Sequence, residues 1–401
     1  MVSYQELCRE LSAAGPGCFG ELSTTGARSV LRRYSDAWMS TAQRRKAGDR
    51  SVRFPRRKRW LMPSRYYAGT FRLDGLRLSI PTARGTPPLT VRLTRPVPYE
   101  TGEVRSVTLL CDDGRLCVDV TVEIPVETRQ PGGQVAGVDL GVIHPYAVVC
   151  PTGALLVSGR ALRAESRLHL ADSKARRRAV ARRAPSKGQI GSRRWKKYRQ
   201  RTKTLERRHQ RRISQAQHEA AKIVVEFAVD HHVDTLIVGD PRGLLAQDSG
   251  HRQNLAVANW RPGQLISRLH DKAQVAGIDL ILVDERGTSS TCPRCHQRVP
   301  KPKGRNFTCP ACHLAAHRDL VGATNIASRN PRGGTPVDPT GLTTLHRRAG
   351  RHLPGRTRRD PRRIAMDTHR SRHGPRPAEA RPDNHHHHTT GESLAQPATA
   401  A

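Results

Sequence analysis

TCPRCHQRVPKPKGRNFTCPACHLAAHRDLVGATNIA, residues 291–327, contains two Cys-x-x-Cys pairs that are separated by thirteen residues. Each pair can place two thiolates about 2.3 Å from one Zn²⁺ ion, and two such pairs complete a tetrahedron. Two disulfides are the alternative, but in a reduced chain this spacing favours a metal. The sequence therefore predicts a zinc ribbon over residues 288–316, with one structural Zn²⁺ bound by Cys292, Cys295, Cys309 and Cys312.

The composition favours a polyanionic partner. The 401 residues include 70 Lys and Arg against 34 Asp and Glu, which gives a formal net charge of +36 at pH 7. Binding of such a chain to phosphates is driven by counterion release, whereas the simpler alternative is a solvated basic surface. No apolar run approaches the ~18 residues of a membrane span, and the N-terminus has no signal-peptide pattern. We therefore expect a cytoplasmic protein with no membrane partner.

Changes in the sequence pattern divide the chain into four regions. Residues 1–68 are basic and helical in pattern. Residues 69–130 hold short alternating segments between Gly and Pro, which predicts a small β-barrel. Residues 131–329 alternate strands with helices, which predicts an α/β sheet. Residues 330–401 are rich in Arg, His, Pro, Gly and Thr without periodicity, and we predict a disordered basic tail there.

The α/β region allows its elements to be predicted one by one. The run 161–229 is dense in Arg and Lys and has no strand pattern, and the segment 184–192 is expected to break it into two helices. The other predicted elements are a strand at 135–139 followed by a hairpin, buried strands at 235–240 and 278–287, and helices at 261–276 and 317–329.

Two carboxylates stand at positions that suit a nuclease. Asp139 ends the first predicted strand beside glycines, and Asp319 lies in the first turn of the last predicted helix. Phosphodiester hydrolysis with two metal ions needs several carboxylates, which hold the Mg²⁺ ions about 4 Å apart. RNase H-like folds supply these carboxylates from the first strand, neighbouring strands and a late helix. Either aspartate alone is more often a turn or cap residue, but together they predict an RNase H-like nuclease.

The segments GVDLGVIHPYAV, TSSTCPRC, CPAC and HRDLVGATNIA resemble the TnpB (OrfB) proteins of insertion sequences, whose ancestry the type V CRISPR effector nucleases share. The resemblance extends over almost the whole chain, to about residue 329. It implies an RNA-guided DNA endonuclease of a transposable element. A guide RNA pairs with a double-stranded DNA target, and the protein reads a short flanking motif. Such a protein would be nucleoid-associated when bound to DNA.

The resemblance also implies a role for each predicted region. It identifies residues 1–68 with a recognition region and residues 69–130 with a wedge barrel. It identifies residues 131–329 with a RuvC-like nuclease domain that binds two catalytic Mg²⁺ ions. The zinc ribbon and the basic helices of 161–229 are insertions in this domain.

One motif departs from the family pattern. The resemblance implies a strand ending in Glu-Asp, but here Gly239 occupies the glutamate position before Asp240. We predict that Glu285 supplies the missing ligand, because adjacent strand ends can meet over one site. Asp240 is the second choice and Asp284 the third, and an ordinary surface position for Glu285 is a further alternative. The predicted catalytic residues are therefore Asp139, Glu285 and Asp319, with Asp240 as the alternative to Glu285.

The start of the chain is a second departure. The family normally opens with a strand and a helix ahead of the segment that YQELCRELSAAG, residues 4–15, resembles. We therefore expect a barrel that lacks one strand or a start codon assigned too late. Together with Gly239, this keeps open a second hypothesis, an RNA-guided DNA-binding protein with an inactive or weak nuclease. A direct DNA transposase is the third hypothesis.

The basic helices are predicted to follow the backbone of the guide RNA. Trp195 or Tyr198 would stack on a base, although packing between helices is the alternative for Trp195. The predicted nucleic-acid-binding residues are Arg176, Arg177, Arg178, Arg193, Arg194, Lys196, Lys197, Arg207, Arg208, Arg211 and Arg212.

Overall fold

The computed structural model describes residues 3–15, 17–56, 62–112, 115–126, 133–241, 250, 254–255, 259–300, 304–333 and 337–353. The predicted tail beyond residue 353 lies outside the described residues, as do residues 242–243 after Asp240. Within the described ranges the chain has a mixed α/β fold. None of its helices there is both long and apolar enough to cross a membrane.

Two helices open the described chain, α1 (Tyr4–Ala13) and α2 (Thr24–Lys46). A capping box starts α1: the Ser3 hydroxyl accepts from the Glu6 amide at 3.2 Å, and the Glu6 carboxylate accepts from the Ser3 amide at 2.7 Å. The helical prediction for residues 1–68 is wrong at its end, where Ser64–Tyr67 forms strand β1. Its alternate residues are buried and its backbone pairs with a later strand, so tertiary pairing overrides the helical pattern.

Two three-stranded antiparallel sheets follow, with the orders β1-β5-β6 and β2-β3-β4. Their strands are β2 (Arg72–Asp74), β3 (Arg77–Ile80), β4 (Leu89–Arg92), β5 (Val104–Asp112) and β6 (Arg115–Val122), with a 3-10 turn, η1, at Thr101–Glu103. One hydrophobic core joins the two sheets, and its buried members are Tyr66, Leu78, Ile80, Val104, Val107 and Leu109.

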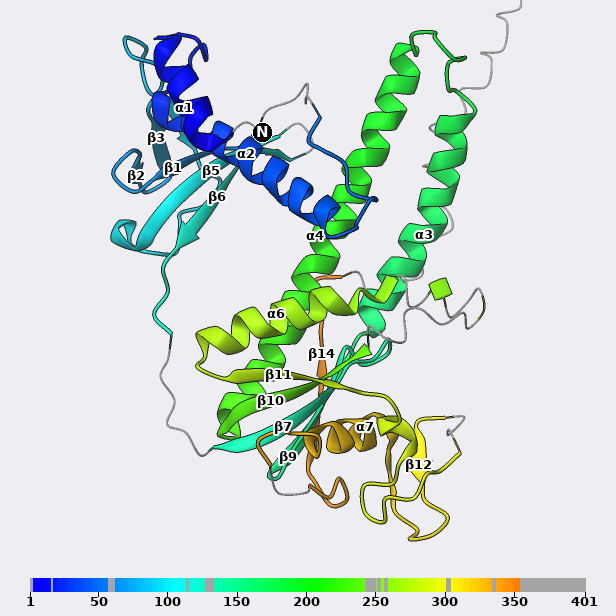
Figure 1. Ribbon diagram of the computed structural model, residues 1–401. Coiled ribbons are helices and arrows are strands. Elements are labelled where there is room, and N and C mark those ends of the chain that lie inside the picture. The colour runs from blue at the N-terminus through cyan, green and yellow to red at the C-terminus, as the bar shows by residue number, and fades with distance from the viewer. Residues whose placement is uncertain are drawn as a thin grey trace, which may run out of the picture. The chain divides into compact units, whose positions relative to one another are not determined.

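A six-stranded sheet in the order β11-β10-β7-β8-β9-β14 forms the centre of the remaining chain (Figure 1). Strands β7, β8 and β9 pair antiparallel, β10 and β11 add in parallel beside β7, and β14 adds in parallel beside β9. The strands are β7 (Gln134–Asp139), β8 (Tyr146–Cys150), β9 (Gly153–Ser158), β10 (Val233–Asp240), β11 (Asp279–Asp284) and β14 (Thr344–Arg348).

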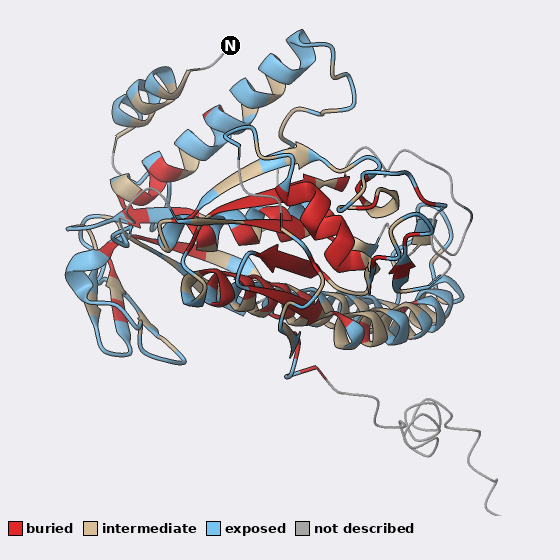
Figure 2. Ribbon diagram, turned by 90° about the horizontal axis from the view of Figure 1, so that it is seen from below, coloured by how far each residue is buried: buried red, intermediate tan, exposed pale blue. Residues whose placement is uncertain are grey.

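Helices cover both faces of this sheet. Side chains of α4 (Arg193–Asp230) and α6 (Pro262–Val275) form one core with strand residues such as Val138 and Leu236. Helix α7 (Arg318–Ala327) packs on the opposite face, where Leu320 and Ala323 meet β8 and β9. Buried residues accordingly gather in the sheet and in the helices against it (Figure 2). Helix α3 (Arg160–Ala181) runs before α4, which confirms the prediction of two basic helices with a break between them.

Two predictions about this region are wrong. Residues 344–348 fall in the predicted disordered tail, yet they form β14, because the edge of β9 offers unpaired backbone groups that a further strand can satisfy. The sequence predicts a buried strand at 278–287, but β11 is an edge strand and Leu282 remains 41% exposed. Its neighbours in the structure are β10, with which it pairs, and α6.

Candidate active site and cysteine cluster

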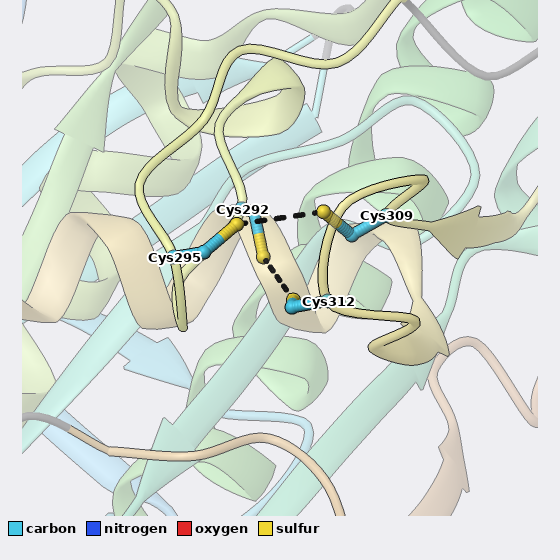
Figure 3. A group of neighbouring side chains, drawn as sticks. All are labelled: Cys292, Cys295, Cys309 and Cys312. Atoms are coloured by element: carbon cyan, nitrogen blue, oxygen red, sulfur yellow. Dashed lines mark hydrogen bonds between the residues drawn. The ribbon is translucent and has the colours of Figure 1, made fainter.

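The four predicted cysteines converge from two loops (Figure 3). The sulfurs of Cys292 and Cys312 lie 3.5 Å apart, as do those of Cys295 and Cys309, and all four lie within 4.8 Å of one another. Four thiolates at about 2.3 Å from one ion require separations of this order. The cluster therefore suggests a zinc site.

The two cysteine pairs are folded in the same way, although they are far apart in sequence. His296 and His313, which follow the second cysteine of each pair, both adopt a left-handed backbone, with φ of 58° and 55°. In this turn backbone amides donate hydrogen bonds to sulfur. Those from Cys312 and Ala311 lower the pKa of the Cys309 thiol to about 6. The repeated backbone bonds are Cys292 N to Gln297 O and Cys309 N to Leu314 O, both at 2.9 Å, and His296 N to Cys292 O and His313 N to Cys309 O, both at 3.0 Å.

A short hairpin, β12 (Asn306–Thr308) and β13 (Ala315–His317), completes the ribbon after the 3-10 turn η3 (Thr288–Ser290). The Asn325 amide of α7 donates to the carbonyl oxygens of Thr288 and Thr291, each at 2.7 Å. The ribbon is thus bound to the helix that carries Asp319.

Close backbone contact between β7 and α7 brings Asp139 to this helix. A Cβ added at Gly137 would lie 1.9 Å from the Ala323 carbonyl oxygen, so only glycine allows the approach. A Cβ at Gly322 would lie 3.1 Å from Asp139 Oδ2. The Asp139 carboxylate therefore packs against Gly322, which lies about one helical turn after Asp319.

Glu285 fills the space above Gly239. A Cβ added at Gly239 would lie 2.9 Å from Glu285 Oε2 and 3.1 Å from Glu285 Cβ. Glu285 Oε2 is buried and has no hydrogen-bond partner among the described residues. A glutamate that follows β11 therefore reaches the place where a side chain from β10 would otherwise stand.

Burial and neighbouring carboxylates raise the pKa of two of these side chains. Burial, and then the charges of Glu285 and Asp319, raise the pKa of Asp139 to about 8. Burial, and then Asp240 and Asp284, raise the pKa of Glu285 to about 7. Burial is the largest cause of both raised pKa values, and repulsion between carboxylates comes second.

Asp319 differs from the other two because cationic side chains contact it. It is only 7% exposed, and it accepts from Arg305 Nη1 at 2.7 and 2.9 Å and bonds to His144 Nδ1 at 2.7 Å. Burial tends to raise the pKa of Asp319, but the hydrogen bond from His144 and the charges of Arg305, His144 and His317 outweigh it and lower the pKa. The sequence pattern predicts neither His144 nor Arg305 at this site, although His144 lies within the segment GVIHPYAV.

The two alternative carboxylates lie beside this group. Asp240 and Asp284 are register partners at the ends of β10 and β11. Asp284 is exposed and pairs with the Arg286 guanidinium at 2.9 Å. Asp240 is half-buried and raises the pKa of Glu285.

The predicted nucleic-acid-binding residues fall into two groups. Four have acidic partners: Arg176 with Asp172 at 3.8 Å, Arg212 with the buried Glu165 at 2.5 Å, and Arg207 and Arg211 with Asp112. The others are exposed, namely Arg177, Arg178, Arg193, Arg194, Lys196, Lys197 and Arg208.

Trp195 and Tyr198, the two aromatic residues predicted to stack on a base, already have cationic neighbours. The Arg199 guanidinium lies 5.2 Å from the Trp195 ring centre, and that of Arg183 lies 4.8 Å from the Tyr198 ring centre. Trp195 is half-buried, and a Cβ at Gly191 would lie 2.2 Å from its ring. Packing against the loop before α4 is therefore the role that the structure gives Trp195.

Two family models match parts of this chain. Residues 115–245 match the family model described as probable transposase (OrfB of IS605), and residues 263–326 match the Cas12f1-like TNB domain. These matches confirm the predicted resemblance to TnpB (OrfB) proteins over those two stretches of the chain. No curated protein sequence matches it.

One solved structure agrees with this chain at the level of the fold. The cryo-EM structure of a Cas12f1–sgRNA–target DNA complex matches with a TM-score of 0.58 and 14% identity over 77% of this chain and 71% of that chain. A CRISPR-Cas12f ternary complex matches with a TM-score of 0.38 and 13% identity over 84% of this chain and 76% of that chain. The first of these supports a fold similar to that of Cas12 effectors.

Proposed function

We propose that this chain is an RNA-guided, Mg²⁺-dependent DNA endonuclease of a transposable element. The observation that carries the proposal is the position of Glu285 in the space above Gly239, where its charge and that of Asp319 both act on Asp139. Carboxylates from β7, the end of β11 and α7 are thus electrostatically coupled through Asp139 in spite of the missing glutamate, although their oxygens do not all lie within 4.8 Å of one another.

The topology supports an RNase H-like, RuvC-type domain. In such folds three antiparallel strands precede parallel strands, and the first strand carries a catalytic carboxylate. Here β7, β8 and β9 are the antiparallel strands, and β10 and β11 extend the sheet beside β7. Asp139 is the last residue of β7.

The residues present fit divalent metal ions. Glu285 Oε2 is buried and has no hydrogen-bond partner among the described residues, and the raised pKa values of Asp139 and Glu285 reflect burial first and then carboxylate repulsion, which cations would relieve. Asp139, Glu285 and Asp319 would hold two Mg²⁺ ions, which activate water and stabilise the leaving oxygen in phosphodiester hydrolysis. Asp240 would remain at the rim.

The four cysteines would hold one structural Zn²⁺, because four thiolates leave no position for water. Its role is to fix the loop that carries Arg305 and the start of α7. Removal of zinc would therefore disturb the active site, because it would displace Arg305 from its contact with Asp319.

Guide RNA and double-stranded DNA are the proposed partners. The similar Cas12f1 structure is a complex with sgRNA and target DNA. The exposed basic residues of α3 and α4 would follow the RNA backbone, and residues 1–68 and 69–130 would serve as recognition and wedge regions. The protein would act in the cytoplasm, on the nucleoid.

Cleavage of a plasmid that matches the guide, with and without Mg²⁺, tests the proposal. Wild type should cut only with Mg²⁺. Glu285→Ala and Asp139→Ala should abolish cleavage while guide-dependent DNA binding survives, and Asp240→Ala should be milder. Because Gly239 removes the family's usual ligand, a DNA-binding protein with a weak nuclease is the second candidate. Matched binding without any cleavage by wild type would establish that candidate instead.

A further inference from the structure

A second group of metal-ligand side chains meets at Asp319. Ligand atoms of His144, His317 and Asp319 lie within 4.8 Å of one another, and in the described part of the chain only the four cysteines form another such group of three or more. The two imidazole rings meet edge to face, with centres 5.3 Å apart. Asp319 is buried and both histidines are half-buried, so the three side chains face a sheltered point.

The loop that carries His144 is held in place by its backbone. The His144 carbonyl accepts from the Gly141 amide at 2.9 Å, and the Ile143 carbonyl accepts from the Gly159 amide at 2.8 Å. A Cβ at Gly141 would lie 2.8 Å from the His144 carbonyl oxygen, and a Cβ at Gly159 would lie 2.8 Å from Pro145. The loop is thus closely packed on both sides, and His144 is preorganised without a ligand.

His317 is equally fixed, because it is the N-cap of α7. Its Nδ1 accepts from the Asp319 amide at 3.2 Å. His144 Nδ1 and Asp319 Oδ2 are 2.7 Å apart, which is hydrogen-bonding distance, so one proton lies between them when they bond. A metal ion that replaced that proton could bind His144 Nδ1 and Asp319 Oδ2 as neighbouring ligands. The His317 imidazole lies beside them as a third ligand.

The donor set differs from that of a magnesium site. Two imidazoles and one carboxylate suit Mn²⁺, Co²⁺, Fe²⁺ or Zn²⁺, whereas Mg²⁺ prefers oxygen. We propose that His144, His317 and Asp319 form a site for a transition-metal dication at one end of the active site, so that its two metal positions are not equivalent. This inference rests on the proposed nuclease function and assigns metal preference within it.

Arg305 is the competitor that such an ion must displace. Its Nη1 contacts both oxygens of Asp319, but its side chain is 39% exposed and reaches Asp319 from the ribbon loop. A long, partly solvated arginine can leave without disturbing the core. Metal binding should therefore release Arg305 from Asp319.

Co²⁺ absorption spectroscopy of the full-length, zinc-loaded protein, without nucleic acid, tests the inference. Wild type should bind Co²⁺ with visible d–d bands and without thiolate charge-transfer bands. His144→Gln and His317→Asn should each weaken this binding by at least about tenfold, the scale expected when a residue that binds or orients a metal is removed. The control is His270→Gln on α6, an exposed histidine that lies 3.9 Å from Asp271. Zinc content and thermal melting are measured for every variant.

The outcomes separate the inference from the proposed function. Unchanged Co²⁺ affinity in both folded variants, or thiolate bands with every bound Co²⁺, overturns the inference. If one variant fails to fold, the other and the wild-type spectrum decide. Plasmid cleavage with Mg²⁺ but without histidine-dependent Co²⁺ binding refutes the inference alone. Histidine-dependent Co²⁺ binding in a protein that cannot cleave supports the metal site and refutes the endonuclease.

Discussion

Neutralising Glu285 should stabilise the metal-free protein at alkaline pH while it destroys the proposed active site. Burial, and then the charges of Asp240 and Asp284, raise the pKa of Glu285 from its ordinary 4.5 to about 7. A carboxyl whose pKa is raised in the folded state favours folding most when it is protonated. Its contribution to stability is fully present below its unfolded pKa of about 4.3 and is lost as pH rises through about 7.

The magnitude follows from the size of this pKa change. The folded pKa of about 7 exceeds 4.5 by about 2.5, and one pKa unit corresponds to about 1.36 kcal/mol, so ionised Glu285 costs at most ~3 kcal/mol. Glu285 is only half-buried, and solvent screening lowers that figure. Glu285→Gln should therefore increase the free energy of unfolding by ~1–3 kcal/mol at pH 8, with the gain vanishing near pH 4.

Urea unfolding at pH 4, 6 and 8 measures this effect. The buffer is depleted of divalent ions but contains no chelator, so that the cysteine cluster keeps its zinc. The control is Glu226→Gln, which removes an exposed helix pair with Lys222 at 3.3 Å and should show no pH-dependent gain. Added Mg²⁺ should stabilise wild type more than Glu285→Gln. A decrease in the stability of Glu285→Gln at pH 8 without Mg²⁺ would refute the reasoning.

Three further predictions address other parts of the molecule. Cys295→Ser should lose the bound zinc and the ribbon fold, and elemental analysis that finds no zinc in the wild type would contradict the zinc assignment. Replacing the exposed residues Arg193, Arg194, Lys196 and Lys197 by Gln should lower the slope of log RNA affinity against log salt by roughly one for each phosphate that these side chains neutralise. An unchanged slope would mean that these residues face solvent. Gly137→Ala should destabilise the fold by about 3 kcal/mol or more, because its Cβ would meet the Ala323 carbonyl. Gly102→Ala has no atom within 4 Å of the added Cβ and serves as the control in denaturation measurements.

Several features of this protein could be predicted from local sequence. The four-cysteine cluster follows from spacing within 21 residues, since Cys292 and Cys312 are its first and last members and both Cys-x-x-Cys turns are short-range. The order of strands and helices follows from apolar periodicity, which depends on neighbours in the chain. The positions of Asp139 and Asp319 at a strand end and a helix start follow for the same reason.

Other features depend on contacts that no local pattern records. Glu285 reaches the space above Gly239 only because β11 lies parallel beside β10, and Asp284 lies opposite Asp240. Strand β14 has no strand pattern of its own, because its pairing with β9, rather than its composition, orders it. His144 and Arg305 meet Asp319 from positions 175 and 14 residues away. Contacts of this kind form when backbone pairing and packing bring together residues that are far apart in the sequence. They are therefore visible only in the folded chain.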